Sequence, residues 1–454
     1  MAFLKPYRLY HKIRNNNSLF FIFYTMKNKL IHSTIILLIG GFITKVLGMV
    51  IKVVMARKIG TEGMGLYMLL LPTFTLLINI SQFGFPIALS KLISEEKRNN
   101  KRLFFSIFPF IILINIIIMI LITIFAPLIS QNLLHNEKTY LSIIAMAFVI
   151  PFTSISSICR SYFFGKGKMI PHVISNIVED LTRLLLISFG ISFFIPLGLS
   201  YAVCFLILSN VISEIASTLI LIFFLPRNIK ITKNDLKPNK KYLKDSLKIS
   251  IPNTGSRLIG SIGYFLEPII LTTILLKVGY SISYITKEYG IITGYVLPIV
   301  LLPSFFTLAM SQAILPIISY ASSNNQIKKV KKTLTFSITM SLLLGGILTI
   351  FLILKPEYLL NILYHTNEGV NYIRIMAPIC LLQYIQSPLT SCLDAIGKSK
   401  DNFKIALTST IIRTLSLFFL CYLKIGMLSY MLSTFISISF TTFYQIKVVR
   451  NFLS

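Results

Sequence analysis

The chain has few charged side chains. They make up 13% of its 454 residues, whereas hydrophobic residues make up 55%. Water-soluble domains carry about 25% charged residues, so this composition excludes a string of such domains and predicts a bilayer as the solvent. Acidic residues are scarcer than basic ones, with 15 Asp and Glu against 44 Lys and Arg. Because the basic residues lie in short clusters between apolar runs, the charge does not indicate nucleic-acid binding.

The sequence also lacks the patterns of disulfide, metal and catalytic sites. Its five cysteines stand singly, without a C-x-x-C pair or a histidine at ligand spacing. Gly397-Lys398-Ser399 resembles the end of a phosphate-binding loop, but Cys392 stands five positions before the glycine and no strand precedes it. No convincing nucleophile, histidine and carboxylate spacing is present. We therefore expect no enzyme, no metal site, no bound cofactor and no direct ATP drive.

Residues 1–25 are basic and lack the features of a signal peptide. The apolar stretch Leu19 to Tyr24 is too short for a signal-peptide core, and no small-residue cleavage site follows it. Met26 directly precedes the first long apolar run, so it is a candidate for the natural start. We treat residues 1–29 as a basic extension.

Long apolar stretches dominate the rest of the chain. Crossing a hydrocarbon core of about 30 Å takes roughly 20 helical residues. Twelve stretches between charged breaks meet this length: 32–55, 65–93, 104–130, 140–163, 172–195, 198–225, 249–276, 289–319, 334–354, 371–396, 403–423 and 425–446. The sequence therefore predicts an all-α polytopic membrane protein with about twelve transmembrane helices.

The loop charges alternate along the chain. With both termini in the cytoplasm, the five internal cytoplasmic connections hold 22 Lys or Arg, including one group around Arg160, and the six outer connections hold seven. This asymmetry is what the positive-inside rule requires. It supports the count of twelve and predicts that both ends are cytoplasmic.

The second half of the chain repeats landmarks of the first at one constant offset. These landmarks are Ser81, Gln82, Pro86, Ile87, Met146, Ala147, Gly167, Lys168 and Arg183, which recur in the same register as Ser311, Gln312, Pro316, Ile317, Met376, Ala377, Gly397, Lys398 and Arg413. A duplicated membrane unit is the usual architecture of secondary transporters. We predict a six-helix lobe over 30–226, a basic cytoplasmic linker over 227–246 and a second six-helix lobe over 247–454, with the substrate path between the lobes.

Several basic side chains fall near the middle of the membrane. An ionised group at that depth costs about 2.5–3.5 kcal/mol, so it calls for a partner or a function. Counting along each helix at its regular rise per residue places four cations in this layer: Lys45, Arg183, Arg257 and Arg413. We predict that these four, together with Lys52, line a cationic cavity for an anionic group such as a pyrophosphate.

Internal ion pairing is the alternative role for these cations. Glu179 lies one turn before Arg183 and is placed to neutralise it, while Asp180, Glu214 and Glu267 are available to the others. Glu214 and Glu267 are also candidates for ion coupling, since membrane carboxylates often bind protons or Na+. Coupling to Na+, to H+ or to the membrane potential remains open.

The opening of the chain resembles a known family. The similar segments are Lys45 with Leu47-Gly48, the loop ARKIGTEGMGLY at 56–67 and GFPIALSKLISE at 84–95. This text is similar to the stage V sporulation protein B group, within the polysaccharide transporter branch of the multidrug/oligosaccharidyl-lipid/polysaccharide exporter superfamily. Weaker similarity, through the Gly-Lys turns at 165–168 and 397–400, extends it to residues 30–450.

The resemblance implies a V-shaped bundle of two six-helix lobes in a bacterial cell membrane. It also implies flipping of a lipid-linked saccharide to the outer leaflet by alternating access, with Lys45 and Arg257 where related lipid II flippases carry cavity cations. Many relatives have fourteen helices, and in some of them the two extra helices form part of a lipid-tail groove. Twelve helices here leave the handling of a polyprenyl tail open.

Three functions are compatible with the sequence. The first is a flippase for a polyprenyl-pyrophosphate-linked peptidoglycan or polysaccharide precursor, with spore-cortex formation as one setting. The second is a drug or organic-cation antiporter, and the third is a non-transporting scaffold whose partners are cell-wall synthesis enzymes. A cation exporter needs an accessible carboxylate, whereas the first apolar stretch carries Lys45 and Lys52 and no acid. The sequence therefore favours an anionic substrate.

Overall fold

The computed structural model describes residues 17–96, 98–225 and 232–453, with side chains from residue 35 onward except 233 and 234. In these ranges the chain forms helices and connecting turns and no strand. The predicted all-α class is therefore confirmed. Residues 1–16 of the expected N-terminal extension and residues 226–231 at the start of the expected linker lie outside the described residues.

The first half forms one group of helices. They are α2 (Asn17–Gln82), α3 (Phe85–Ser94), α4 (Asn100–Pro127), α5 (Tyr140–Gly165), α6 (Met169–Phe194) and α7 (Leu199–Phe223), with the short turns η1 (Leu128–Leu133), η2 (Glu137–Thr139) and η3 (Ile195–Leu197). α2 contains the first predicted stretch and most of the second. The chain kinks between them at Gly60, whose φ of 65° and ψ of −172° are not helical. Glycine alone reaches this region without strain.

The second half forms the other group. It comprises α8 (Lys233–Leu236), α9 (Lys240–Val278), α10 (Ile282–Gly290), η4 (Ile291–Val296), α11 (Leu297–Val300), α12 (Ser304–Ser323), α13 (Ile327–Leu354), α14 (Pro356–Tyr364), α15 (Val370–Ala395), α16 (Ser399–Cys421) and α17 (Leu428–Leu453). The eighth predicted stretch is not one helix. It is divided among α10, η4, α11 and α12, with Pro298 and Pro303 near the breaks, because proline cannot donate to the helical ladder.

Helix bounds follow the register of the sequence repeat in places. α15 begins and ends at the positions that match the two ends of α5, and α16 begins at the position that matches the start of α6. Among the described helices, nine are long and apolar enough to cross a membrane, with α2 counted once despite its kink. The count of twelve spans and the full repeat remain predictions.

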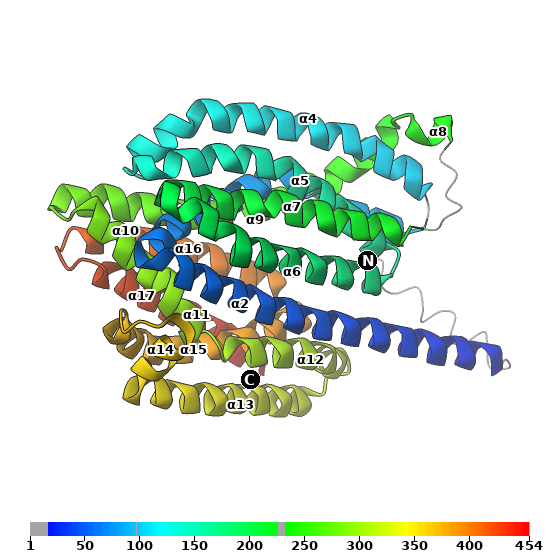
Figure 1. Ribbon diagram of the computed structural model, residues 1–454. Helices are drawn as coiled ribbons and strands as arrows, with labels where there is room; N and C mark the ends of the chain where they lie inside the picture. Colours follow the sequence, from blue (N-terminus) through cyan, green and yellow to red (C-terminus); the bar gives the residue numbers. More distant parts are fainter. Residues whose placement is uncertain (1–16, 97, 226–231, 454) are drawn as a thin grey trace.

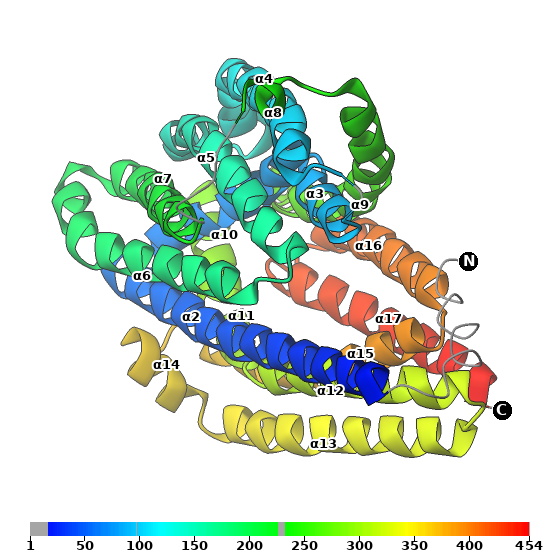
Figure 2. The same cartoon turned by 90° about the vertical axis from the view of Figure 1, so that its right-hand side faces the viewer.

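The helices run roughly along one direction, so the bundle has two ends (Figure 1). We call the end that carries α8 and the start of α2 the linker end, and the opposite end, with the turn between α9 and α10, the far end. Seen from the right of Figure 1, α3 to α7 and α12 to α15 lie on different sides, and α2 runs between them (Figure 2). We call these groups the N lobe (α2–α7) and the C lobe (α9–α17).

α9 contacts both lobes. Near the linker end, Asp245 of α9 forms an ion pair with Arg98 of the N lobe, with 2.9 Å between Oδ2 and Nη2. Farther along, Gly263 packs so closely on α16 that a Cβ there would lie 2.1 Å from the Thr410 methyl carbon. The helix therefore crosses from the N lobe to its own lobe near mid-length.

The lobes meet closely at the far end. A Cβ on Gly65 of α2 would lie 2.1 Å from the Thr286 carbonyl oxygen of α10, and Tyr295 donates to the Ala56 carbonyl oxygen at 3.2 Å. The largest apolar core spans both lobes, with Met64 of α2 and Tyr295 among its fully buried members. Burial of this apolar area holds the far end closed.

Candidate functional site

One face of α2 carries two lysines and two glycines. Gly41, Lys45, Gly48 and Lys52 follow each other at helical spacing, so they line one side of the helix. A Cβ added at Gly41 or Gly48 would meet no atom within 4 Å. Lys45 is exposed and Lys52 is half-buried. This side of α2 is therefore not covered by a neighbouring helix at these glycines.

A matching face of α9 carries Asn253, Arg257, Gly260 and Tyr264. On one side of it Gly263 packs on α16, and on the other Ser261 accepts a hydrogen bond from Asn79 of α2. The face between these contacts therefore looks into the space between the lobes. A Cβ at Gly260 would meet no atom there. We call the two faces together the central face.

The cations of the central face lack acidic partners. Within the part of the chain that the structure describes, Lys45, Lys52 and Arg257 form no ion pair. Arg257 is half-buried, and its Nη1 donates to the Gln82 side-chain oxygen at 3.5 Å. Lys45 and Lys52 stand about two turns apart on one side of α2, so their like charges repel. The central face therefore has an excess of positive charge.

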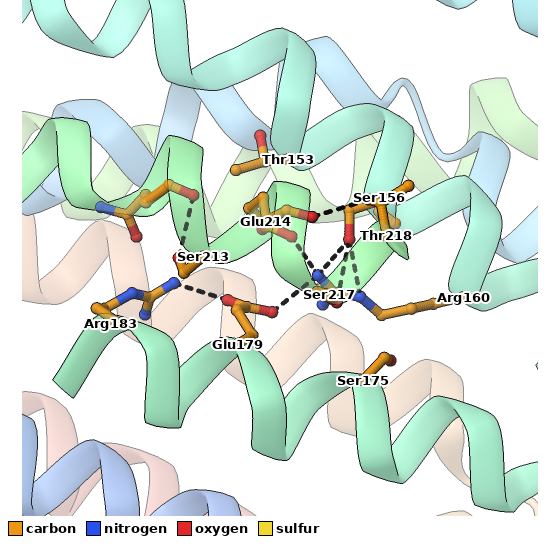
Figure 3. A network of polar contacts seen from close by, with 12 residues as sticks. Thr153, Ser156, Arg160, Ser175, Glu179, Arg183, Ser213, Glu214, Ser217 and Thr218 are labelled. Atoms are coloured by element: carbon orange, nitrogen blue, oxygen red, sulfur yellow. Dashed lines mark hydrogen bonds and ion pairs between the residues drawn. The ribbon is translucent and has the colours of Figure 1, made fainter. Parts of the chain in front are cut away.

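Arg183, in contrast, belongs to an ion-pair network inside the N lobe (Figure 3). Its Nη2 lies 2.6 Å from Glu179 of the same helix, and the other oxygen of Glu179 lies 2.8 Å from Arg160 of α5. Arg160 also pairs with Glu214 of α7 and donates to Ser156. Two arginines and two carboxylates thus form a neutral network across three helices.

Arg413 is neutralised in the C lobe. Its Nη2 lies 2.7 Å from Glu267 of α9, whose side chain is 4% exposed, and 3.2 Å from the Tyr430 hydroxyl. Tyr289 donates to the other Glu267 oxygen at 3.3 Å. The guanidinium also lies over the Tyr430 ring, 5.5 Å from its centre. Glu267 and Arg413 are therefore one buried pair between α9 and α16.

A small polar cavity adjoins this pair. Its volume is about 130 Å³, and it lies between α9, α16 and α17. It is lined by Gly260, Gly263, Tyr264, Glu267, Thr410, Arg413, Thr414, Leu417 and Ser437. Because Gly260 and Tyr264 belong to both, the cavity touches the central face.

An apolar cavity lies on another side of α2. It has a volume of about 540 Å³ and separates α2 from α12 and α13. It is lined by Phe42, Val46, Met49, Val50, Val53, Leu302, Pro303, Phe305, Phe306, Leu344, Leu348 and Leu363. Phe42, Val46 and Val50 are exposed. The same helix thus has a cationic side and an apolar side, about a quarter to a third of a turn apart.

The sequence of this chain matches two protein-family models. The sequence model described as polysaccharide biosynthesis protein matches residues 30–322, more than half of the chain. This chain belongs to the polysaccharide biosynthesis protein family. A second model, MatE, matches residues 268–423.

Two relatives from Bacillus subtilis (strain 168) extend the likeness over most of the chain. Stage V sporulation protein B is 33% identical over 398 residues, which cover 86% of this chain and 77% of that protein. Lipid II flippase MurJ is 22% identical over 422 residues, which cover 83% of this chain and 74% of that protein. The resemblance to the stage V sporulation protein B group is confirmed.

Two solved structures share the fold. An inward-facing multidrug resistance MATE transporter of the MOP superfamily has a TM-score of 0.71 at 14% identity and covers 90% of this chain and 94% of its own. Lipid II flippase MurJ in an inward closed conformation has a TM-score of 0.68 at 16% identity and covers 91% and 87%. This family member is thus a multi-pass membrane protein with a MATE-like and MurJ-like fold.

The structure separates the five cations that the sequence groups together. Lys45, Lys52 and Arg257 lie on the central face, whereas Arg183 and Arg413 are paired, as the alternative of internal pairing predicts. Their substrate-binding role remains a prediction. Both candidates for ion coupling, Glu214 and Glu267, are arginine partners. Asp180 is half-buried and forms no ion pair among the described residues.

The role of Arg160 as an ion-pair partner was missed, because the sequence reasoning counted it with the basic residues around the connection that follows the stretch 140–163. Arg160 lies within α5, and its side chain is 17% exposed. The signal was available in the sequence, because Arg160 stands five residues before the Gly165 that ends the helix. A long arginine side chain there reaches back along the helix, as Cα–Cβ bonds point toward the N-terminus. Tyr264 and Tyr430 were also missed, since tyrosines are common in membrane helices.

Proposed function

We propose that this protein is a flippase that moves a polyprenyl-pyrophosphate-linked saccharide across the membrane by alternating access. The observation that carries the proposal is the excess charge of the central face. Lys45, Lys52 and Arg257 lie on the central face without acidic partners among the described residues. Since a charge at mid-membrane is costly, the unneutralised Lys45 and Arg257 favour an anionic ligand that neutralises them.

A pyrophosphate fits the chemistry of these side chains. Arg257 offers a planar fork of donors that matches two phosphate oxygens, and Lys45 offers a compact charge. An organic cation, the substrate of the alternative function, would meet repulsion at the same place. The charge of the central face therefore supports the flippase over the antiporter.

The apolar cavity beside α2 supports a lipid-linked substrate. An amphipathic molecule needs a polar site for its head group and an apolar path for its tail. α2 borders both, with Lys45 on the central face and Val46 in the apolar cavity. A tail that lies between α2 and α12 would remain in an apolar environment while the head group crosses. We propose this route for the polyprenyl chain.

Coupling at Glu214 or Glu267 would require an ion pair to open. Each carboxylate contacts an arginine, Arg160 and Arg413 respectively. A proton or Na+ bound there would compete with a guanidinium that is already in place. We propose that any coupling at these residues is linked to rearrangement of the helices that carry the pair. The membrane potential acts on the central face directly, because it is net positive.

The biological setting that we propose is cell-wall assembly in a bacterial cell membrane, with the linker end in the cytoplasm. The name of the relative stage V sporulation protein B supports sporulation as one context. The name of the relative lipid II flippase MurJ supports a peptidoglycan precursor as the cargo. Cell-wall synthesis enzymes would then be the partners that use the flipped precursor.

The test is transbilayer movement of a labelled polyprenyl-pyrophosphate saccharide in proteoliposomes. We expect Lys45→Ala/Arg257→Ala to reduce the rate at least tenfold, because both cations lie on the central face. Arg374→Ala is the matched control, since Arg374 pairs with Glu357 at the exposed far end. Uptake of an organic cation is measured in parallel. Unchanged flipping in the double variant, or cation uptake without flipping, would overturn the proposal.

A further inference from the structure

The 130 Å³ cavity beside Glu267 and Arg413 has a chemistry different from that of the central face. The central face is cationic, whereas the cavity pairs one carboxylate with one guanidinium and adds the hydroxyls of Thr410, Thr414 and Ser437. A phosphate placed there would meet the Glu267 carboxylate. A neutral ligand rich in hydroxyl groups would meet both donors and acceptors.

Part of the Arg413 guanidinium is available to a ligand. Its ion pair with Glu267 and its hydrogen bond to Tyr430 both use Nη2, so Nη1 is left to donate to a ligand. The side chain is 32% exposed although it lies in the interior of the bundle, because it lines the cavity. The site therefore gains from a ligand that brings acceptors to the guanidinium.

The size of the cavity limits the ligand. One water needs about 10–15 Å³ of such space, so 130 Å³ accommodates roughly ten water-sized groups, about the number of heavy atoms in a hexose ring with its substituents. Tyr264 contributes an aromatic side chain to the wall, and Gly260 and Gly263 contribute no side chain to it. A flat polar ring matches these surroundings.

The cavity also lies where the proposed substrate would place its sugar. Arg257 precedes Gly260 by three residues on the same face of α9. The axial rise between their Cα atoms is about 4.5 Å, less than one helical turn. A pyrophosphate held at Arg257 would therefore bring its first sugar beside Gly260.

We infer that this cavity is a saccharide subsite, which binds one sugar ring of a lipid-linked substrate through Glu267, Arg413 and Tyr264. The inference rests on the proposed function. It concerns the residues that bind the sugar, whereas the central face binds the pyrophosphate. Glu267 accepts from a sugar hydroxyl, Arg413 donates to a sugar oxygen, and Tyr264 packs against the ring.

The test compares two probes that differ only in the sugar. One is a polyprenyl pyrophosphate with a single hexose, and the other is the same polyprenyl pyrophosphate without a sugar. Binding of each to the purified full-length protein is measured by native mass spectrometry. We expect the wild type to bind the sugar-bearing probe about tenfold more tightly, and Gly260→Leu, which fills the mouth of the cavity, to abolish this preference.

Gly255→Leu is the matched control. A Cβ at Gly255 also meets no atom, but this glycine lies on a different side of α9 and does not line the cavity. It should retain the preference. Thr414→Val, which removes one lining hydroxyl at almost constant volume, should reduce the preference severalfold and guards against a folding defect in Gly260→Leu.

The outcomes separate the two claims. If the wild type binds neither probe, the proposed function fails and the subsite with it. If the wild type binds both probes equally, or if Gly260→Leu weakens both by the same factor, the saccharide subsite is wrong while the pyrophosphate site stands.

Discussion

Arg57 of α2 holds the end of α14, which belongs to the other lobe. Its Nε donates to the Leu363 carbonyl oxygen at 2.6 Å, and its Nη2 donates to the Ile362 carbonyl. The last carbonyls of a helix have no partner within it and carry the negative end of the helix dipole. A guanidinium satisfies both needs. This contact joins the lobes at the far end, where Gly65 and Gly290 also meet.

Loss of this contact should open the far end. Arg57→Ala removes two hydrogen bonds from a charged donor, each worth about 1.5–3 kcal/mol, so the open state gains population. We expect alkylation of a cysteine placed at Thr61, which lines the cavity beside Arg57, to accelerate at least fivefold in a background without native cysteines. Arg374→Ala, which breaks only an exposed pair with Glu357, should leave the rate unchanged. An unaltered rate in Arg57→Ala would show that this contact does not hold the lobes together.

A methyl group at Gly65 should have the same effect by steric means. In Gly65→Ala the Cβ would lie 2.1 Å from the Thr286 carbonyl oxygen, so the backbones of α2 and α10 must separate. We expect faster alkylation at position 61 and a flipping rate reduced at least tenfold, because alternating access needs the closed far end. Gly346→Ala on α13, where a Cβ meets no atom, is the control. Normal flipping by Gly65→Ala would argue against this closure as a transport state.

Arg160 and Arg183 should contribute unequally to stability. Arg160→Met leaves Glu214 without an arginine, and breaking such a buried pair costs about 3–5 kcal/mol. Arg183→Met leaves Glu179 paired with Arg160, so its cost should be smaller. Thermal unfolding in detergent, followed by circular dichroism, measures both. The double variant Arg160→Met/Glu214→Leu should recover stability, since the pair of Glu179 and Arg183 remains; equal losses in the two single variants would contradict the network.

Replacement of Arg413 should lower the stability of the fold, whatever its effect on transport. Arg413→Met leaves Glu267, which is 4% exposed, without its cationic partner. We expect the free energy of unfolding to fall by about 3–5 kcal/mol, and Arg413→Met/Glu267→Gln to regain at least half of it. The same unfolding assay checks this. If the double variant is no more stable than the single one, charge neutralisation is not what Arg413 provides. Loss of transport in an Arg413 variant alone therefore does not identify a substrate contact, which is why Lys45 and Arg257 are the better pair to test.

The sequence by itself determined the helical membrane fold and the approximate place of its helices. Long apolar runs and proline breaks are local properties, and a bilayer leaves helices as the solution when no strand pattern is present. It also located Lys45, Arg183, Arg257 and Arg413, because each interrupts an apolar run.

Only the tertiary structure decided which cations are neutralised. Arg160 and Glu214, like Arg413 and Glu267, lie on different helices, and nothing in their spacing along the chain shows that they meet. Lys45, Lys52 and Arg257 look no different from them in sequence. Ion pairing depends on distance in space, so the packing of α5, α6 and α7 in one lobe and of α9 and α16 in the other leaves the positive charge on the central face.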